Sequence, residues 1–468
     1  MKRRALLVHP WICDFAAYDF WIHPLGLLLI GGFLRGRGWE VELVDALAGG
    51  REETRRRWDG TSPFHSLPLP YPACISPASA SSDARTSPSG APAPPHPSRR
   101  FRRYGCSSPE MAHRLASARR PDAILVSIQM TYWHRAWNEV LPFLQAAHPG
   151  VPIFLGGGYA CLEPVHASRR EGVAAVFSER RPDRLLASLC RHLAEPPPRP
   201  EELERLSAAW SLRESPPHAA LLTSWGCPFA CAYCATPGNL GGWRPRAMDA
   251  VVTELEEIRA HSRLEHIACY DDALLYRSAD HFLPFVKRVA GNPHLAGLRW
   301  HFPNALHARW LDRPVAAALR RLGAESVWIG AESCDAEFLR VTGDKARVVD
   351  VEAALAAMEA ERFRPRVLGA YVLAGVPGLA DESVVASMER LHSLGLAISL
   401  ATYSPIPGTP LFAEAAAKDP RLRTEPLLQN NTLREMADPM RWARLRGRAR
   451  ELNRILSRGA EATPQLPE

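Results

Sequence analysis

Short apolar runs alternate with amphipathic stretches along the first part of the chain. The runs that predict buried strands are residues 5–9, 40–45, 123–128 and 151–155, with a fifth at 174–177. Helical patterns such as 24–36 and 136–148 separate them. Strands that are apolar on both faces are typical of a parallel sheet covered by helices on both sides. Residues 1–194 are therefore predicted to form a doubly wound α/β domain, which holds ligands beyond the carboxyl ends of its strands.

A second alternating series follows a Pro-rich linker at 195–214. Its predicted strands are residues 219–223, 265–270, 297–302, 325–331, 366–374 and 396–403. The intervening segments repeat apolar residues at i, i+3 and i+4, the helical pattern. Six strand–helix units are fewer than the eight of a closed barrel. We therefore expect a partial (β/α)6 barrel over 215–410 and a C-terminal helical extension over 411–468, whose Arg-rich helix packs on the outside.

One segment departs from this alternation. Residues 61–103 are rich in Pro, Ser and Ala and end in a run of arginines. Such a composition buries too little apolar surface to offset its ordering entropy. The segment is predicted to be a disordered insertion in a surface connection, with the arginine run solvated.

Composition narrows the class of protein. Of the 468 residues, 46% are hydrophobic and 23% charged, which is ordinary for a globular protein. No apolar run is long enough to cross a membrane, and the N-terminal apolar stretch is interrupted by His9, Pro10 and Asp14. This stretch is therefore predicted to be a strand and not a signal peptide, and the protein is expected in the cytoplasm. The net charge of +7 is a small excess spread along the chain, so a nucleic-acid partner is not expected.

Three of the ten cysteines lie within eight residues: Cys227, Cys231 and Cys234, spaced C-x3-C-x2-C. Without an export signal, such a cluster indicates metal or redox chemistry in a reducing compartment. Three thiolates hold three irons of a cubane cluster and leave the fourth iron open. Structural zinc is an alternative, but it prefers four ligands in two pairs, and the next cysteine along the chain is Cys269. Plain burial of the cysteines is the other alternative.

With Tyr233 before the last cysteine, the motif resembles the signature of the radical S-adenosylmethionine (SAM) superfamily. The six strand–helix units are similar to that superfamily's partial barrel, and the first domain is similar to a cobalamin-binding domain. Further motifs, at 270–275, 301–307, 330–333 and 403–409, resemble an uncharacterised group within it. The resemblance covers nearly the whole chain except 61–103. It implies a 4Fe–4S cluster on the three cysteines, with Phe229 and Tyr233 beside the cofactors. It also implies that SAM is reductively cleaved to a 5′-deoxyadenosyl radical.

Polar residues follow the predicted barrel strands at the end where this chemistry occurs. Asp271 and Asp272 are candidates to accept hydrogen bonds from the SAM ammonium, although either is also suited to cap a turn. Asn304 and His307 are candidates for contact with SAM or substrate, or for a structural role. Glu332 is predicted to be buried and so needs a partner, for which the SAM amine or ribose hydroxyls are suitable.

Two later loops complete the predicted site. Gly375 and Pro377 are expected to let the backbone approach the adenine. Tyr403 begins a Pro-rich loop predicted to close the site, and it is a candidate hydrogen or proton donor, with packing as the alternative.

Cobalamin domains carry D-x-H-x-x-G after the first strand, and this chain lacks that motif. The nearest match places Asp19 four residues before His23, so His23 is a weak candidate cobalt ligand. Relatives without the motif bind cobalamin without a histidine ligand. Ser127, Gly156 and Gly157 are candidates for contact with the cofactor, and an unoccupied packing domain is the alternative.

The leading hypothesis is therefore a cobalamin-dependent radical SAM methyltransferase acting on an unactivated carbon or phosphorus centre. The alternatives are a radical rearrangement, cyclisation or oxidation without cobalamin, RNA modification, or an iron–sulfur electron carrier. The expected partners are a small-molecule or natural-product substrate and a low-potential donor such as ferredoxin or flavodoxin, with no membrane.

Overall fold

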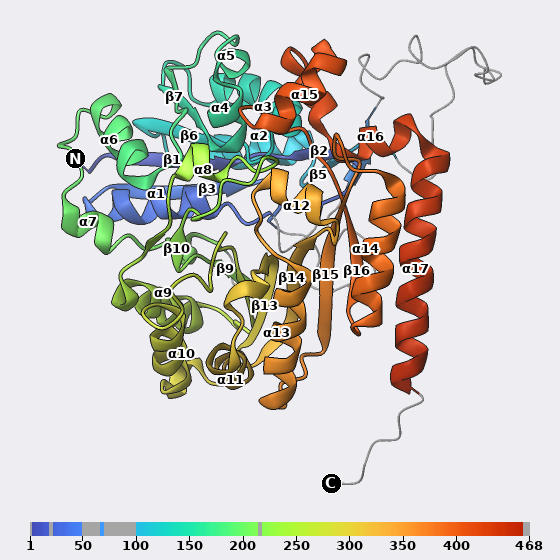
Figure 1. The fold of residues 1–468 in the computed structure, drawn as a ribbon. Helices are drawn as coiled ribbons and strands as arrows, with labels where there is room; N and C mark the ends of the chain where they lie inside the picture. The colour runs from blue at the N-terminus through green and yellow to red at the C-terminus, as the bar shows by residue number, and fades with distance from the viewer. Residues whose placement is uncertain (1, 18–21, 49–65, 70–99, 214–217, 462–468) are drawn as a thin grey trace, which may run out of the picture. The chain divides into compact units, whose positions relative to one another are not determined.

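The computed structural model describes residues 2–17, 22–48, 66–69, 100–213 and 218–461 (Figure 1). These residues belong to two compact units. The first comprises Met1–Pro216, Ala260–Ser262 and Ala416–Ala437, and the second comprises Pro217–Arg259, Arg263–Ala415 and Asp438–Glu468.

The first unit is built on a five-stranded parallel sheet with the order β3-β1-β6-β7-β8. Its strands are β1 (Arg4–His9), β3 (Glu40–Asp45), β6 (Ala123–Ser127), β7 (Ile153–Gly156) and β8 (Ala175–Val176). Helix α1 (Leu25–Gly36) lies on one face, and α2 (Ser108–Ser117) and α3 (His134–Ala147) lie on the other (Figure 1). The order is the doubly wound type with its switch point between the first and third strands of the sheet, here β1 and β6. The predicted fold class is confirmed.

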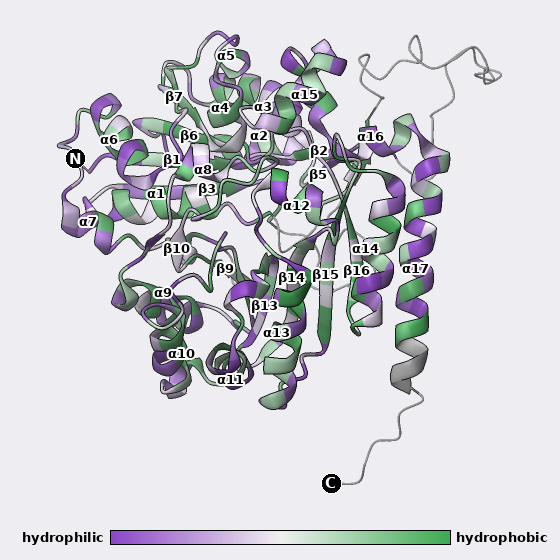
Figure 2. Ribbon diagram, viewed as in Figure 1, coloured by the Kyte–Doolittle hydropathy of each residue, from purple (hydrophilic) through white to green (hydrophobic). Residues whose placement is uncertain are grey.

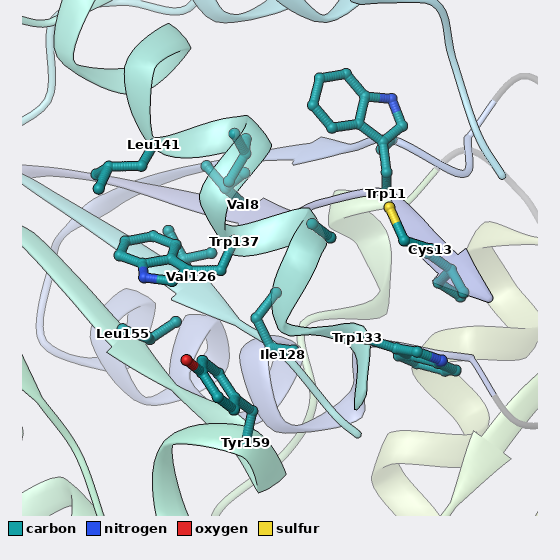
Figure 3. Packing of buried hydrophobic residues seen from close by; sticks show 14 of the residues in the cluster. Val8, Trp11, Cys13, Val126, Ile128, Trp133, Trp137, Leu141, Leu155 and Tyr159 are labelled. Atoms are coloured by element: carbon teal, nitrogen blue, oxygen red, sulfur yellow. The ribbon is translucent and has the colours of Figure 1, made fainter. Parts of the chain in front are cut away.

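Packing on both faces explains the continuous apolar runs of these strands. Trp137 and Leu141 of α3 lie over the sheet residues Val8, Val126 and Leu155 (Figure 3). Trp137 and Leu155 are both fully buried. Further helices of this unit are α4 (Gly157–Leu162), α5 (Pro164–Ala167), α6 (Pro182–His192) and α7 (Pro200–Glu204).

The described ends of the predicted disordered insertion are ordered. β4 (Ser66–Pro68) and β5 (Arg102–Tyr104) pair with β2 (Ile12–Asp14) in a small antiparallel sheet. The Arg103 guanidinium lies 4.5 Å from the ring centroid of Trp11, and Phe101 is fully buried. The prediction of disorder therefore does not hold for residues 66–69 and 100–103, and Arg103 packs on an aromatic ring, whereas Arg100 is exposed as predicted. Residues 61–65 and 70–99 lie outside the described residues.

The second unit contains a six-stranded parallel sheet with the order β16-β15-β14-β13-β12-β9. Its strands are β9 (His218–Leu221), β12 (His266–Cys269), β13 (Arg299–Leu306), β14 (Ala324–Glu332), β15 (Val367–Ala374) and β16 (Ala397–Thr402). The larger helices that alternate with them are α9 (Met248–His261), α10 (Phe282–Ala290), α11 (Arg313–Leu322), α13 (Val348–Ala360) and α14 (Asp381–Ser393). Figure 2 shows mainly apolar strands and helices with mixed faces. The predicted partial barrel is confirmed.

The C-terminal extension is divided between the two units. Residues 416–437, with α16 (Asn431–Ala437), belong to the first unit, where Asn430 donates to the buried Asp14 at 2.8 Å. Helix α17 (Pro439–Glu461) belongs to the second unit and packs against α14 and β16. There the Asn453 side chain makes two hydrogen bonds to the backbone of Ile398, so it occupies edge groups of β16 that would otherwise be open to another strand. None of the described helices combines the length and apolar character needed to cross a membrane.

Candidate active site

The three clustered cysteines lie on a loop that leaves the carboxyl end of β9. The loop begins with β10 (Ser224–Trp225), which pairs with β11 (Arg244–Pro245). Gly226 has φ +74°, and a Cβ there would lie 2.5 Å from the carbonyl oxygen of Gly241. Only glycine fits this turn, because any side chain would clash with backbone.

Backbone contacts then hold the centre of the loop in place. The Ala232 amide donates to the carbonyl of Thr342 at 3.0 Å, and the Ala232 carbonyl accepts from the amide of Leu411 at 3.1 Å. Gly343 has φ +119°, and a Cβ there would lie 3.2 Å from the Cα of Cys231. The loop is thus clamped between the segment after α12 (Ala336–Thr342) and the start of α15 (Pro410–Lys418).

The cysteines are free thiols; Cys231 is buried, and Cys227 and Cys234 are half-buried. Burial raises the pKa of Cys227 to about 12, and the carboxylate of Asp272 and the other two cysteines act in the same direction. Among the described residues, no three ligand atoms that include a cysteine sulfur lie within 4.8 Å of one another. A single tetrahedral zinc would need sulfurs about 3.8 Å apart, given a Zn–S bond of about 2.3 Å. The three sulfurs therefore suit a larger cluster better than a single ion.

The two aspartates after β12 have different surroundings. Asp271 is buried and accepts hydrogen bonds from the amide and hydroxyl of Thr223 and, at 2.6 Å, from the hydroxyl of Ser224. It therefore anchors the start of the cysteine loop. Asp272 is half-buried and close enough to Cys227 to affect its pKa. Of the two, Asp272 is the one that remains suited to an ammonium ligand.

Glu332 ends β14 beside the cysteine loop in a strained conformation. Its φ is +62°, and the register of β14 against β15 shifts between Gly330 and Glu332. The residue is 7% exposed, and its carboxylate lies 2.7 Å from the ammonium of Lys345. The predicted need for a partner is thus met inside the protein. Burial acts to lower the pKa of Lys345, but the attraction of Glu332 outweighs it and the pKa is raised. The charge of Lys345 in turn acts to lower the pKa of Cys231, against the larger effect of burial.

Aromatic rings surround the tip of the cysteine loop. Phe229 stacks on His307 and on Trp310, with ring centroids 5.4 and 5.3 Å apart. Burial lowers the pKa of His307 well below its ordinary value, and the charges of Lys345 and Arg309 act in the same direction. His307 is therefore a neutral ring that packs under the loop, which agrees with the structural alternative for this residue.

Other predicted residues take roles within the protein. Asn304 donates to the carbonyl of Tyr270 at 2.6 Å. Tyr233 is half-buried, and its hydroxyl forms a hydrogen bond with Cys231. Gly375 has φ +73°, and a Cβ there would lie 3.0 Å from the ring of Trp442, which belongs to α17. Tyr403 is 3% exposed, which agrees with packing as its role.

The predicted cobalt ligand is buried in the first unit. His23 is 2% exposed, its Nδ1 lies 2.5 Å from a guanidinium nitrogen of Arg213, and its ring packs against Trp210. Since the guanidinium only donates, the nitrogen that faces it accepts. The ring is thus committed to protein contacts, and Asp19 of the near-motif lies outside the described residues.

The residues after β6 and β7 pack mainly on each other. A Cβ on Gly157 would lie 2.4 Å from the carbonyl of Ile128 and 2.6 Å from the hydroxyl of Ser127. Because glycine has no side chain, position 157 leaves room for the loop at residues 127–128. Gly156 is different, because the closest atom to a Cβ there would be 3.9 Å away. Only Gly156 of these glycines offers the open backbone that was predicted for a cofactor.

Two of the polar groupings that were not predicted involve Lys345 and Asp45. Lys345 is one of only four lysines in an Arg-rich chain, and that rarity is the one signal that points to it. At the ends of β1 and β3, His9 and Arg213 contact the buried Asp45 at 2.9 and 3.1 Å. Burial opposes the charge of Asp45, but His9 and Arg213 outweigh it and hold its pKa below the ordinary value. Both groupings join residues that are far apart in sequence.

Comparisons with known proteins agree with this geometry. The model of the radical SAM superfamily matches residues 221–391. An uncharacterised methyltransferase of Pyrococcus horikoshii is 25% identical over 208 residues, 43% of each chain. Bacteriochlorophyllide d C-12(1)-methyltransferase of Chlorobaculum tepidum is 26% identical over 203 residues, 42% of each chain. The chain thus matches less than half the length of these two relatives.

Two solved structures share the fold over most of the chain. TsrM of Kitasatospora setae, a radical SAM methyltransferase with cobalamin and a 4Fe–4S cluster bound, has a TM-score of 0.61 and 16% identity, covering 89% of this chain and 75% of its own. OxsB, a cobalamin-dependent SAM radical enzyme, has a TM-score of 0.54 and 13% identity, covering 91% and 56%. Residues 221–391 thus match the radical SAM superfamily, and the chain shares the fold of these two cobalamin-binding structures over most of its length.

Proposed function

We propose that this radical SAM enzyme binds a 4Fe–4S cluster through Cys227, Cys231 and Cys234 and cleaves SAM reductively. One observation carries the proposal: the C-x3-C-x2-C loop is clamped at the carboxyl end of the first barrel strand, with its sulfurs spread too widely for one ion. Parallel barrels place their chemistry at this end. The cluster, when bound, supplies the electron that divides SAM into methionine and a 5′-deoxyadenosyl radical.

The residues around the loop suit both the cluster and the amino-acid end of SAM. Asp271 fixes the start of the loop, and Tyr233 forms a hydrogen bond with the sulfur of Cys231. Asp272 provides a carboxylate near Cys227, whereas Lys345 provides a cation near Cys231. SAM presents an ammonium and a carboxylate at its methionine end. We infer that Asp272 favours the first group and Lys345 the second, with Glu332 holding the Lys345 ammonium in place.

The test is anaerobic reconstitution with iron and sulfide, followed by SAM and dithionite. We expect about four irons per chain and the formation of 5′-deoxyadenosine and methionine in equal amounts. Cys231→Ala is expected to lose both the visible absorption of the cluster and the nucleoside. Cys334→Ala is the matched control, because Cys334 is a half-buried cysteine outside the loop. Full nucleoside formation by Cys231→Ala would refute the assignment.

Methyl transfer with cobalamin is the finer proposal. It is supported by the sheet order of the first unit, by the cobalamin in the TsrM and OxsB structures, and by methyltransferase relatives. His23 does not suit the role of cobalt ligand, because it is buried against Arg213. We therefore propose binding without a histidine ligand, near Gly156, and assign no step of the reaction to this cofactor.

Two products separate methyl transfer from the other radical reactions. After reconstitution with hydroxocobalamin, a cobalt-bound cofactor should survive desalting and show its visible spectrum. Reduction with titanium(III) citrate in the presence of SAM should then yield S-adenosylhomocysteine. Formation of 5′-deoxyadenosine alone, with no retained cobalamin, would instead favour a rearrangement, cyclisation or oxidation. We propose a small-molecule substrate and a ferredoxin or flavodoxin as the electron donor.

A further inference from the structure

A second group of potential metal ligands lies at the other end of the barrel strands. His266 is the first residue of β12, Glu325 is the second of β14, and His301 is the third of β13 between them. These are amino ends, whereas the cysteine loop leaves a carboxyl end. His266 and His301 are 0% and 1% exposed, and the Glu325 side chain is 16% exposed. The three side chains thus converge at the amino ends of three neighbouring strands. Solvent has limited access to them, on the side of Glu325.

Three atoms of this group form a compact triangle. His266 Nδ1 and His301 Nε2 are 2.7 Å apart, and Glu325 Oε2 lies 3.7 Å from each of them. The point equidistant from the three atoms is about 2.0 Å from each, which is the length of zinc–imidazole and zinc–carboxylate bonds. Among the described residues, this is the one set of three such ligand atoms within 4.8 Å of one another. The spacing therefore fits a single small divalent ion.

The other ring nitrogens of the two histidines face polar groups of the protein. His301 Nδ1 lies 2.9 Å from the hydroxyl of Ser326, and His266 Nε2 lies 3.8 Å from a carboxylate oxygen of Glu265. If His301 Nδ1 and His266 Nε2, the outer nitrogens, carry the ring protons, then His301 Nε2 and His266 Nδ1, the inner nitrogens, each present a lone pair to a metal. The contact of His301 matches the usual arrangement around bound metal, in which the other ring nitrogen of a ligand histidine bonds to an oxygen, whereas 3.8 Å at His266 is longer than a hydrogen bond.

The Glu325 carboxylate also turns one oxygen toward the two histidines and the other away from them. Its Oε1 accepts from Arg366 at 3.3 Å, while its Oε2 is buried and accepts no hydrogen bond from the described residues. A buried carboxylate oxygen needs a cation or a donor. The nitrogens His266 Nδ1 and His301 Nε2 lie 3.7 Å from it, and at 2.7 Å from each other they share one proton when no metal is bound.

We propose that His266, His301 and Glu325 bind one divalent transition metal of the zinc type. Two imidazoles and a carboxylate suit zinc and its neighbours in preference to magnesium or calcium. Because both histidines are buried, the ion serves to join β12, β13 and β14 at the base of the barrel and does not meet substrate. The site is independent of the iron–sulfur cluster and of the proposed reaction.

The experiment uses the full-length chain in which the three cysteines of the loop are replaced, so that the loop cannot bind zinc. A Cys227→Ala/Cys231→Ala/Cys234→Ala variant is titrated with Zn²⁺ against a chromophoric chelator, and with Co²⁺ to record d–d absorption. We expect one Zn²⁺ per chain to remain after desalting, and a Co²⁺ spectrum of a nitrogen–oxygen site. Adding His301→Gln or Glu325→Gln should weaken binding by more than tenfold, and adding Ser326→Ala by about tenfold or more.

Controls separate the site from nonspecific binding and from misfolding. His294→Gln, which changes an exposed histidine of the same unit, should bind Zn²⁺ as the parent does. Glu325→Gln keeps the size of the side chain, so it tests the site if His301→Gln does not fold. Absence of retained zinc in the parent, or equal retention by Glu325→Gln and His301→Gln, would overturn the proposal. That result would leave a hydrogen-bonded imidazole pair in place of a metal site.

Discussion

Replacing Lys345 by Met should strongly destabilise the second unit. Lys345 is the cation 2.7 Å from Glu332, and the two side chains are 15% and 9% exposed. Methionine matches the lysine stem in shape but leaves the carboxylate without its partner. Removing one member of a buried ion pair costs about 3–5 kcal/mol, because the remaining charge is neither solvated nor neutralised.

The size of the effect can be separated from a general loss of packing. At about 2–4 °C per kcal/mol for a unit of this size, Lys345→Met should lower the melting temperature by roughly 6–20 °C. Glu332→Gln/Lys345→Met should recover most of this loss, because replacing a buried pair with neutral groups is often nearly neutral. Lys287→Met, at an exposed position of α10, is the control for losing one positive charge.

The assay is circular dichroism melting of the cluster-free protein under anaerobic, reducing conditions. The single variants Lys345→Met and Glu332→Gln, the double variant and the parent form a double-mutant cycle. This cycle isolates the coupling free energy between the two side chains. The reasoning would be refuted if Lys345→Met had the same melting temperature as the Lys287→Met control. A coupling free energy below about 0.5 kcal/mol would refute it as well. In either case the short Lys345–Glu332 contact would contribute nothing measurable.

Three further predictions follow from contacts elsewhere in the chain. Asp271→Ala should lower both the melting temperature and the iron content after reconstitution, whereas Asp272→Ala should retain iron and weaken SAM binding by about tenfold or more, measured by equilibrium dialysis. Burial lowers the pKa of His134 to about 4, so its neutral form is favoured in the folded state and stability should rise with pH between about 4 and 6.5. A His134→Gln variant with the same pH slope as the parent would contradict this. Asn430→Ala should cost about 1–3 kcal/mol in urea unfolding, since it removes a donor from the buried Asp14.

Much of the architecture follows from local patterns. The strands were predictable because parallel strands covered on both faces are apolar at nearly every position, and such runs are visible within a few residues. The cysteine loop was predictable for a similar reason, since its three ligands lie within eight residues. The short strands β4 and β5 were not, because their order depends on contacts with β2 and Trp11.

The sequence alone determined the two parallel sheets, the number of barrel strands and the thiol chemistry of the loop. Only the tertiary structure decided which polar side chain serves which partner. Neighbouring Asp271 and Asp272 read alike in sequence, yet one is enclosed by Thr223 and Ser224 and the other is not. Glu332 obtains its cation from Lys345, thirteen residues further along the chain. A local pattern reports whether a position is apolar, but the energy of a buried charge is set by groups that folding brings from distant segments to within a few ångströms.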